Sequence, residues 1–282
     1  MSSDEIKLLE QKLYGVLKEK LPDGIALAYS GGVDSSFLLE ILTEMNAETP
    51  GKAIALTMCS PLQEPEFQMK IENKLKNSGI PWKSFHLNPL ELEQVKNNRK
   101  KRCYFCKKMM FLAFQTFAEG NGFHTLMDGS NTDDKKEFRP GGEACRKLNI
   151  FSPLAELGFG KDAIRQCLRF RHSSVAELPS KPCFATRFEY DVELTEAMLN
   201  TVCHCENFVQ KYLPPNANLR LRVHGSTARI EAEAFYWHKL LENRESILRE
   251  LHRHGFQHVC LDLDGFRSGS FDHDLSRQKQ NE

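Results

Sequence analysis

The stretch that decides the fold is Ser30-Gly31-Gly32-Val33-Asp34-Ser35-Ser36. A continuous apolar run at 25–29 precedes it, and Phe37-Leu38-Leu39-Glu40-Ile41-Leu42 follows with the composition of a helix. Glycines between a buried strand and a helix let backbone N–H groups approach an anion, and the helix N-terminus adds positive potential. The stretch therefore predicts a phosphate-binding turn. It is not a Walker loop, because no Gly-Lys-Ser/Thr ends it, and it lacks the GxGxxG dinucleotide pattern.

Strands and helices are expected to alternate on both sides of this turn. Apolar residues at helical spacing predict a helix over 6–17, ahead of the strand at 25–29. After the turn, the expected elements are a strand at 53–57, a helix at 64–76, a strand at 82–87, a helix at 106–119 and a strand at 123–127. This alternation predicts an α/β fold, with right-handed crossovers and a parallel sheet covered by helices.

The pattern changes near a proline-rich segment at 179–182, and we place a domain boundary there, giving domains 1–182 and 183–282. Ahead of it, residues 128–142 are expected to form a loop and a helix to begin near Lys161. Beyond it, we expect a small α+β domain with a helix at 195–212, strands at 219–224 and 227–232, a helix at 235–254 and a strand at 258–263. The polar tail after Asp272 is expected to be frayed.

Composition excludes several classes of protein. With 282 residues, 40% hydrophobic and 27% charged, the chain matches a globular protein rather than a collagen-like or disordered one. Lys plus Arg and Asp plus Glu are 38 each, so no global field favours DNA or bulk RNA. The N-terminus lacks the basic and apolar regions of a signal peptide, and no apolar run suits a membrane span. We expect a cytoplasmic protein without a membrane partner.

Three cysteines are candidates for metal or sulfur chemistry. Nine cysteines without a secretory signal favour reduced thiols or metal ligands over a disulfide framework. Cys103-Tyr104-Phe105-Cys106 places two sulfurs on one side of a loop or first helical turn, inside a run, 96–108, with seven Lys or Arg and no acid. Cys183 lies in a proline-flanked loop. The remaining six are interpreted as core or surface residues: Cys59, Cys145, Cys167, Cys203, Cys205 and Cys260.

Two arginines in the second domain are candidates for binding a phosphate monoester. Arg220 and Arg222 share one strand face by period-two alternation, and guanidinium groups suit phosphate oxygens. Glu231 is expected on the paired strand, able to orient a cationic group or bind a divalent metal. The competing interpretation is that these are solvated charges on a half-exposed sheet.

The chain resembles a known family once its motifs are taken in order. The turn at 30–36 resembles the PP-loop, SGGxDS, of the ATP pyrophosphatase superfamily. The whole series resembles the LarE family of ATP-dependent sulfur transferases, which build the nickel-pincer nucleotide cofactor. The matching stretches are SGGVDSS (30–36), KRCYFCKKMMF (101–111), DGSNTDD (128–134), RPG (139–141), SPLAELGFGKDAIR (152–165), KPCFATR (181–187), LRLRVHGSTARIE (219–231) and VCLDLDGFRSGS (259–270).

This resemblance implies a PP-loop domain, of the adenine nucleotide alpha hydrolase-like fold, followed by an α+β domain that binds substrate and forms homo-oligomers. It implies that ATP with Mg²⁺ adenylates a carboxylate of pyridinium-3,5-biscarboxylic acid mononucleotide, a small-molecule substrate, releasing pyrophosphate. The adenylate is then converted to a thiocarboxylate. The ATP-binding residues implied are Ser30, Gly31, Gly32, Val33, Asp34, Ser35, Ser36, Thr57, Asp128 and Arg187, and the substrate-binding residues are Arg220, Arg222 and Glu231.

The source of sulfur differs within this family. Some members sacrifice one cysteine, at the position of Cys183, and are left with dehydroalanine. Others carry three cysteines and are assigned an iron–sulfur cluster as sulfur carrier. Cys103, Cys106 and Cys183 together favour a 4Fe-4S cluster here, with these three as catalytic residues and metal ligands and with sulfide or a sulfur-donor protein as the supply.

Three other functions stay open. A tRNA thiolase also joins a PP-loop to three cluster cysteines, and the basic run at 96–108 could face a phosphate backbone, although zero net charge argues against an extended RNA footprint. An amidating ligase of the same superfamily would leave the cysteines idle. A nucleotide-binding regulatory protein would show no turnover.

Overall fold

A computed structural model describes residues 3–135, 140–179 and 181–267. The chain divides into two units, Met1–Lys181 and Pro182–Glu282, each with its own sheet. The expected fold class, an α/β PP-loop-type domain with a smaller sheet-containing domain, is confirmed. Some of the sequence features named above lie outside the described residues: Arg139, Ser180, 268–270 and the tail after Asp272.

A parallel four-stranded sheet forms the centre of the first unit. Its order is β3 (Trp82–His86), β2 (Ala53–Cys59), β1 (Ile25–Ala28) and β4 (Thr125–Met127). Every neighbouring pair is parallel, as predicted. All four residues of β1 are buried, because a parallel sheet is covered on both faces.

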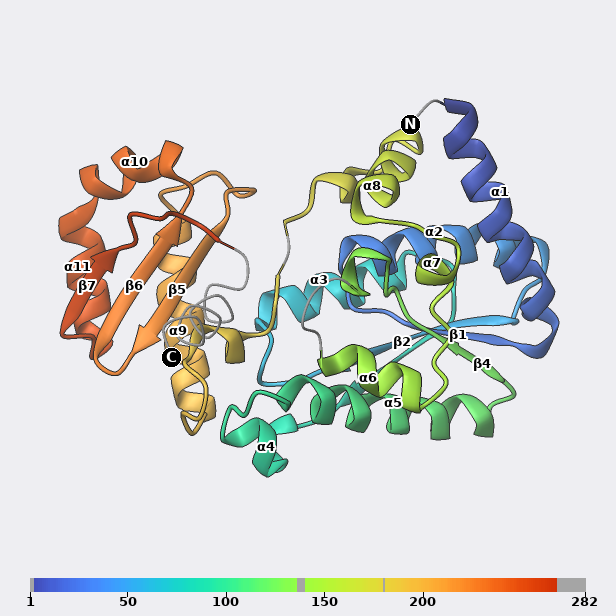
Figure 1. Cartoon of the computed structure of the whole chain (residues 1–282), viewed down its shortest axis with the longest axis horizontal. Helices are drawn as coiled ribbons and strands as arrows, with labels where there is room; N and C mark the ends of the chain where they lie inside the picture. Colours follow the sequence, from blue (N-terminus) through green and yellow to red (C-terminus); the bar gives the residue numbers. More distant parts are fainter. Residues whose placement is uncertain (1–2, 136–139, 180, 268–282) are drawn as a thin grey trace, which may run out of the picture. The chain divides into compact units, whose positions relative to one another are not determined.

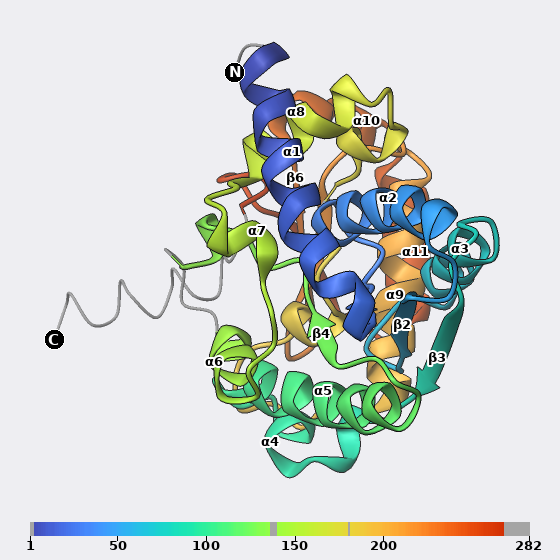
Figure 2. The same ribbon diagram turned by 90° about the vertical axis from the view of Figure 1, so that its right-hand side faces the viewer.

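The side chains of β1 alternate between two apolar cores. Ile25 and Leu27 belong to the core that includes α1, α2, α3 and α8, whereas Ala26 and Ala28 belong to the core that includes α5 and α6. Figure 1 shows α2 and α5 on opposite sides of the sheet, and Figure 2 shows both layers from the side. The α-helices of this unit are α1 (Ser3–Lys20), α2 (Val33–Glu48), α3 (Pro65–Lys76), α4 (Glu93–Lys96), α5 (Arg102–Gly120), α6 (Pro140–Lys147), α7 (Pro153–Glu156) and α8 (Lys161–Phe170).

The order of the strands reverses beside β1. From β1 the chain passes to β2 and β3 on one side and then returns to β4 on the other. Ligands of open parallel sheets bind outside the carboxyl ends of the strands at such a reversal. The turn after β1 and the loop after β4 therefore stand where a nucleotide is expected.

One predicted loop is partly helical. The stretch 140–142 forms the first turn of α6, and α5 begins at Arg102, ahead of the predicted start at Cys106. Proline at the first helical position loses no hydrogen bond, because that N–H has no helical acceptor. A Cβ at Gly141 would lie 2.8 Å from Cδ of Lys107, so glycine lets α6 approach α5. A Pro-Gly pair indicates a turn in isolation, and helix packing overrides that preference here.

The second unit is a three-stranded sheet with helices. Its order is β5 (Leu219–His224), β6 (Thr227–Ala232) and β7 (His258–Leu261), with β5–β6 antiparallel and β6–β7 parallel. Its α-helices are α9 (Glu196–Gln210), α10 (Trp237–Glu242) and α11 (Arg244–Arg253). Both units also contain 3₁₀ turns: Leu21–Asp23, Pro89–Glu91, Asp133–Lys135, Ser174–Glu177, Phe184–Arg187 and Ala234–Tyr236.

The single helix predicted over 235–254 is wrong. The chain forms a 3₁₀ turn, then α10, and breaks at Asn243 before α11 begins. The Asn243 side chain donates to the backbone oxygen of Lys239 at 2.8 Å. Such a bond competes with the helical ladder, so asparagine favours a helix end. Within the described ranges, no helix is both long and apolar enough to span a membrane.

Candidate functional site

The turn after β1 depends on glycine at its second position. Gly31 has a φ of 73°, a left-handed conformation that glycine adopts without strain. An added Cβ there would lie 2.6 Å from Cγ1 of Ile71 in α3. Gly32 caps the N-terminus of α2. The chain can therefore enter α2 while the turn stays packed against α3.

Three serines hold this turn by hydrogen bonds. The backbone N–H of Ser30 donates to Oγ of Ser35 at 3.3 Å, and the two hydroxyl oxygens lie 3.1 Å apart. The Ser35 hydroxyl also donates to the backbone oxygen of Gly32 at 3.2 Å, and the Ser36 hydroxyl lies 3.2 Å from that of Tyr29. The first amides of an α-helix have no acceptor within the helix. A fixed turn at the N-terminus of α2 is therefore suited to a phosphate group.

The structure brings Thr57 and Asp128 to the same end of the sheet. The backbone N–H of Tyr29 donates to Leu56 at 2.8 Å, so the buried Thr57 lies level with the start of the turn. Asp128 directly follows β4, and a Cβ on its neighbour Gly129 would lie 2.9 Å from the backbone nitrogen of Ser35. Glycine at 129 thus allows the loop after β4 to contact the first turn of α2.

Asp34 lies in a polar cluster at this point. Its Oδ2 accepts a hydrogen bond from Nδ2 of Asn131 at 3.0 Å. Burial raises the pKa of Asp34 to about 6, the bond from Asn131 lowers it, and the charge of Asp134 raises it further. Two neighbouring carboxylates offer the oxygen ligands that Mg²⁺ prefers. Asn131 belongs to the DGSNTDD stretch but was not singled out from the sequence.

Asp128 is the centre of a second polar cluster. Its carboxylate accepts hydrogen bonds from the hydroxyls of Ser130 at 2.6 Å and Ser152 at 2.7 Å. Nζ of Lys107 lies 3.7 Å from Oδ2, and the thiol of Cys145 donates to the same oxygen at 3.3 Å. Burial disfavours the Lys107 ammonium, but nearby negative charges, that of Asp128 foremost, together outweigh burial and raise the pKa of Lys107. A lysine that stays charged near the reversal of strand order can contact a nucleotide phosphate.

The role of Cys145 was missed by sequence reasoning. Burial raises its pKa to about 11, so the thiol is protonated at neutral pH and acts as a hydrogen-bond donor to Asp128 rather than as a nucleophile. No spacing motif marks this cysteine. Its position follows from the packing of α6 on α5, which only the tertiary structure shows.

Two further polar groups after β2 were also missed. Ser60 and Gln63 follow the last residue of that strand, and Oγ of Ser60 and Oε1 of Gln63 are buried without a hydrogen-bond partner among the described residues. Buried polar groups normally find partners. A ligand at the carboxyl ends of the strands would supply them.

Cys103 and Cys106 lie three residues apart at the start of α5, are half-buried and form no disulfide. Residues three apart share a helix face, so the two sulfurs are arranged as the spacing predicts. Cys183 is also free and half-buried, but it belongs to the second unit, where it caps the 3₁₀ turn Phe184–Arg187. Convergence of the three sulfurs stays a prediction.

In the second unit, Arg187 forms a buried ion pair with Glu206. Its Nε and Nη2 donate to the two carboxylate oxygens at 2.8 and 2.7 Å. Burial opposes the ionised carboxylate, but Arg187 outweighs burial and lowers the pKa of Glu206. Arg187, implied above as an ATP ligand, thus contacts a carboxylate within its own unit.

The charges predicted on β5 and β6 are buried rather than solvated. Arg220, Arg222 and Glu231 are 7%, 4% and 0% exposed, and Arg220 pairs across the sheet with Glu231. Nε of Arg222 donates to Oε2 of Glu231 at 3.0 Å, and Arg229 donates to Oε1 at 3.1 Å. Arg222 also donates to the backbone oxygen of Thr186. The interpretation as a half-exposed charged strand is therefore wrong at these positions.

This cluster brings several guanidinium groups together. Ion pairs join Arg187 to Glu206, Arg222 and Arg229 to Glu231, and Arg229 to Asp262. Arg220 lies close enough to Arg187 and Arg222 for their charges to act on it. Burial and then the charge of Arg187 lower the pKa of Arg220 to about 10. A bound anion would relieve both effects, so the cluster is suited to a phosphate.

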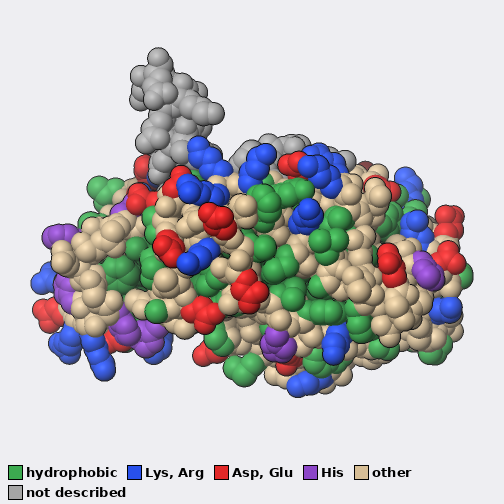
Figure 3. All heavy atoms as spheres, turned by 90° about the horizontal axis from the view of Figure 1, so that it is seen from below, with side chains coloured by type: hydrophobic (Ala, Val, Ile, Leu, Met, Phe, Trp, Pro, Cys, Tyr) green, Lys and Arg blue, Asp and Glu red, His purple; other side chains and the backbone are tan. Residues whose placement is uncertain are grey.

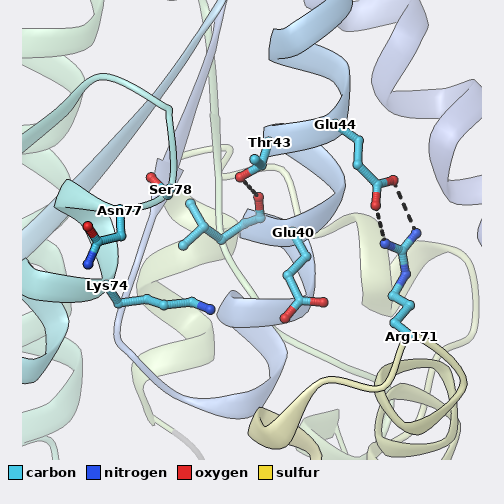
Figure 4. Close-up of a pocket in the computed structure, with 8 residues that line it drawn as sticks. Glu40, Thr43, Glu44, Lys74, Asn77, Ser78 and Arg171 are labelled. Carbon is cyan, nitrogen blue, oxygen red and sulfur yellow. Dashed lines mark hydrogen bonds and ion pairs between the residues drawn. The ribbon is translucent and has the colours of Figure 1, made fainter.

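A cavity of about 500 Å³ lies elsewhere, beside the second half of α2 (Figure 4). It is lined by Glu40 and Lys74, and Arg171 forms an ion pair with Glu44 at 2.6 Å on its rim. Glu44 stands about 16 Å along the helix axis from the start of α2, at 1.5 Å per residue. This cavity is therefore distinct from the turn at 30–36.

Comparison with known proteins assigns the chain to a family. No family model matches the sequence. An uncharacterised protein of Methanocaldococcus jannaschii is 32% identical over 91% of this chain and 96% of its own length. The chain belongs to the family of that protein.

Two proteins similar to this chain carry functional names. The pyridinium-3,5-bisthiocarboxylic acid mononucleotide synthase of Lactiplantibacillus plantarum is 27% identical over 90% of each chain. The tRNA-cytidine(32) 2-sulfurtransferase of Bdellovibrio bacteriovorus is 26% identical over 40% of this chain and 44% of its own length. The first name describes synthesis of a nucleotide with thiocarboxylic acid groups and the second describes sulfur transfer. The first similarity extends across both units.

Proposed function

We propose that this protein is an ATP-dependent sulfurtransferase of the LarE type. Its acceptor would be a carboxylate of pyridinium-3,5-biscarboxylic acid mononucleotide, which becomes a thiocarboxylate during nickel-pincer nucleotide cofactor biosynthesis. The observation that carries the proposal is the turn at 30–36, held at a strand-order reversal in a chain similar along its length to the L. plantarum synthase. Such a reversal is where parallel sheets bind nucleotides.

In the first unit, the turn at 30–36 would hold the pyrophosphate of ATP. Asp34, with Asp134 nearby, would bind Mg²⁺, which would neutralise phosphate charge. The acceptor carboxylate attacks the α-phosphorus, the α–β phosphoanhydride bond breaks, and pyrophosphate leaves. Lys107, kept charged by Asp128, would stabilise the negative charge of the α-phosphate during this step.

In the second step, sulfur replaces AMP. A sulfur nucleophile attacks the acyl carbon of the adenylate, the bond to the phosphate oxygen breaks, and AMP leaves with that electron pair. Cys103, Cys106 and Cys183 would hold an iron–sulfur cluster, which would carry the sulfide. The seven basic residues of the 96–108 run would offset the charge of the thiolates there.

The arginine cluster of the second unit would bind the nucleotide phosphate of the acceptor. The gathering of guanidinium groups around Arg220, where burial and then the charges of Arg187 and Arg222 lower its pKa, supports this assignment. Glu231 would position Arg222 and Arg229 rather than touch the acceptor itself, since both of its oxygens already accept from them. Homo-oligomers and a cytoplasmic location belong to the same proposal.

A tRNA thiolase is the second candidate, favoured by the match to the B. bacteriovorus enzyme. Acidic and basic side chains are interspersed among the described residues on the face shown in Figure 3. A tRNA surface requires an extended positive footprint. The charge distribution therefore favours the small acceptor.

The deciding experiment is release of labelled pyrophosphate from ATP with each acceptor in turn. The pyridinium mononucleotide should accelerate release and yield AMP, whereas an unmodified tRNA should not. If only tRNA accelerates pyrophosphate release, the protein is a tRNA thiolase. If a carboxylic acid together with ammonia accelerates it, the protein is an amidating ligase. If no acceptor accelerates it, the protein binds nucleotide without turnover. Production of ADP would contradict the whole assignment.

The sulfur source is tested separately by mass spectrometry after anaerobic turnover. The cluster hypothesis expects iron and sulfide in the protein and an intact Cys183. A Cys183 fragment lighter by about 34 Da, with fully active Cys103→Ala and Cys106→Ala variants, would instead show that Cys183 gives up its own sulfur by losing H₂S.

A further inference from the structure

Three potential metal ligands converge in the second unit, on residues that the proposed reaction does not use. His204 lies on α9, Glu250 lies on α11, and His254 caps the C-terminus of α11. Nε2 of His204 lies 2.7 Å from Oε1 of Glu250, and Nε2 of His254 lies 3.3 Å from the same oxygen. One ligand atom from each residue lies within 4.8 Å of the other two.

We propose that His204, Glu250 and His254 form a binding site for a divalent transition-metal ion of the zinc class. Imidazole nitrogens and a carboxylate oxygen are ligands of Zn²⁺ at about 2.0–2.2 Å. Tetrahedral bonds of that length separate the ligand atoms by roughly 3.3 Å. The three side chains need only small rotations from their present spacing to reach it.

The helices hold the three groups in place. Glu250 and His254 are four residues apart, so they lie on one face of α11. The imidazole rings of His204 and His254 have centroids 4.4 Å apart, which places the α9 ligand against the same face. The C-terminus of α11 carries negative partial charge, which favours a cation. Arg253 beside it partly opposes this effect.

The charge and exposure of the cluster fit an exchangeable ion. As metal ligands, two neutral imidazoles and one carboxylate would supply a single negative charge, which suits a divalent cation. The side chains of His204, Glu250 and His254 are 52%, 18% and 30% exposed, which gives an ion access from solvent. Three protein ligands leave a coordination position for water or an anion.

Sulfur is not a fourth ligand in this arrangement. Cys205 neighbours His204 in the sequence, but consecutive residues of a helix do not face the same way. The Cys205 side chain is 0% exposed, in the core, whereas His204 faces Glu250 and His254. The donor set is therefore His₂Glu, which selects zinc-class ions over Mg²⁺ because imidazole nitrogen is a poor ligand for hard cations.

The test measures Zn²⁺ binding by calorimetry on the full chain. Other thiols could bind zinc, so the titration is done in a Cys103→Ser, Cys106→Ser, Cys183→Ser background and repeated in the wild-type chain. We expect one equivalent assigned to this cluster, and an excess of MgCl₂ should not compete with Zn²⁺ for it. His204→Ala and His254→Ala should each weaken it by at least 100-fold, because losing even an outer partner of a metal ligand costs 10–100-fold.

The matched control is His238→Ala, an exposed histidine on α10 that should leave binding unchanged. Circular dichroism should be the same for all variants, since the side chains removed are partly exposed. Equal zinc affinity in the His204, His254 and His238 variants, or no bound equivalent in the cysteine-free background, would overturn the proposal. If that background fails to fold, loss of one equivalent between the wild-type chain and His204→Ala decides the matter. Because the ATP reaction is not measured, this result is independent of the proposed function.

Discussion

The two regions proposed to bind phosphate groups use different chemical groups. The turn at 30–36 uses backbone amides, two glycines and short serine side chains at a helix N-terminus. The cluster around Arg220 uses long charged side chains buried on a sheet. The first depends on backbone geometry and the second on balanced charge, so they should fail under different substitutions.

The largest effect is expected from Glu231→Gln. This change removes the buried negative charge that pairs with Arg222 and Arg229, and breaking a buried ion pair costs about 3–5 kcal/mol. The free energy of unfolding in urea should fall by that amount. Glu189→Gln, which removes a half-exposed partner of His224, should cost under about 1 kcal/mol. If both variants lose the same unfolding free energy, burial does not determine how much the ion pairs of the arginine cluster contribute to stability.

A smaller loss is expected from Gly129→Ala. The new Cβ would lie 2.9 Å from the backbone nitrogen of Ser35, so the loop after β4 must move away from α2. Overpacking of this kind costs about 1–3 kcal/mol, and ATP affinity should fall with it. In Gly142→Ala the Cβ meets nothing within 4 Å, so stability should rise slightly and ATP affinity should not change. An unchanged ATP affinity in Gly129→Ala would show that the contact between the loop after β4 and α2 does not contribute to nucleotide binding.

Arg220→Ala should affect one ligand and spare the other. Loss of a charge-assisted contact to phosphate is worth about 1.5–3 kcal/mol, or one to two decades in acceptor affinity. ATP affinity, measured by titration, should hardly change, and Arg220→Lys should restore little if the contact is bidentate. The control is Arg244→Ala, which removes an exposed arginine of the same unit. Equal losses of affinity for the acceptor and for ATP would show that the two ligands share one phosphate site.

The smallest effect concerns Asp34 and pH. Its pKa is raised from 3.8 to about 6, chiefly by burial, so the folded state binds this proton more tightly than the unfolded state. The stabilisation is present below pH 4 and is lost as the pH rises through about 6. Partial exposure limits the change to about 1 kcal/mol. Without Mg²⁺, the unfolding free energy of the wild type relative to Asp34→Asn should fall over that range, and a flat difference would contradict the raised pKa.

The sequence predicted most of the first unit because its signals are local. Strand β1 is a short apolar run followed by a glycine turn, and the burial of all four of its residues follows from a parallel sheet. The paired glycines at 31 and 32 indicated the anion site for the same reason, since φ above zero and a helix N-terminus are properties of neighbouring residues. Prediction failed at Pro140 and Asn243, where packing or a side-chain bond decided the helix boundary.

The sequence by itself determined the α/β class, the glycine turn between strand and helix, and the placement of Glu231 on the strand next to Arg220 and Arg222. Periodicity and turn chemistry act over a few residues, which is why these features could be predicted. Only the tertiary structure decided that Cys145 and Lys107 meet at Asp128, that Arg220 and Arg222 are buried, and that His204 joins Glu250 and His254. These groups come from elements far apart in the chain. Their contacts depend on how helices pack, which no spacing in the sequence records.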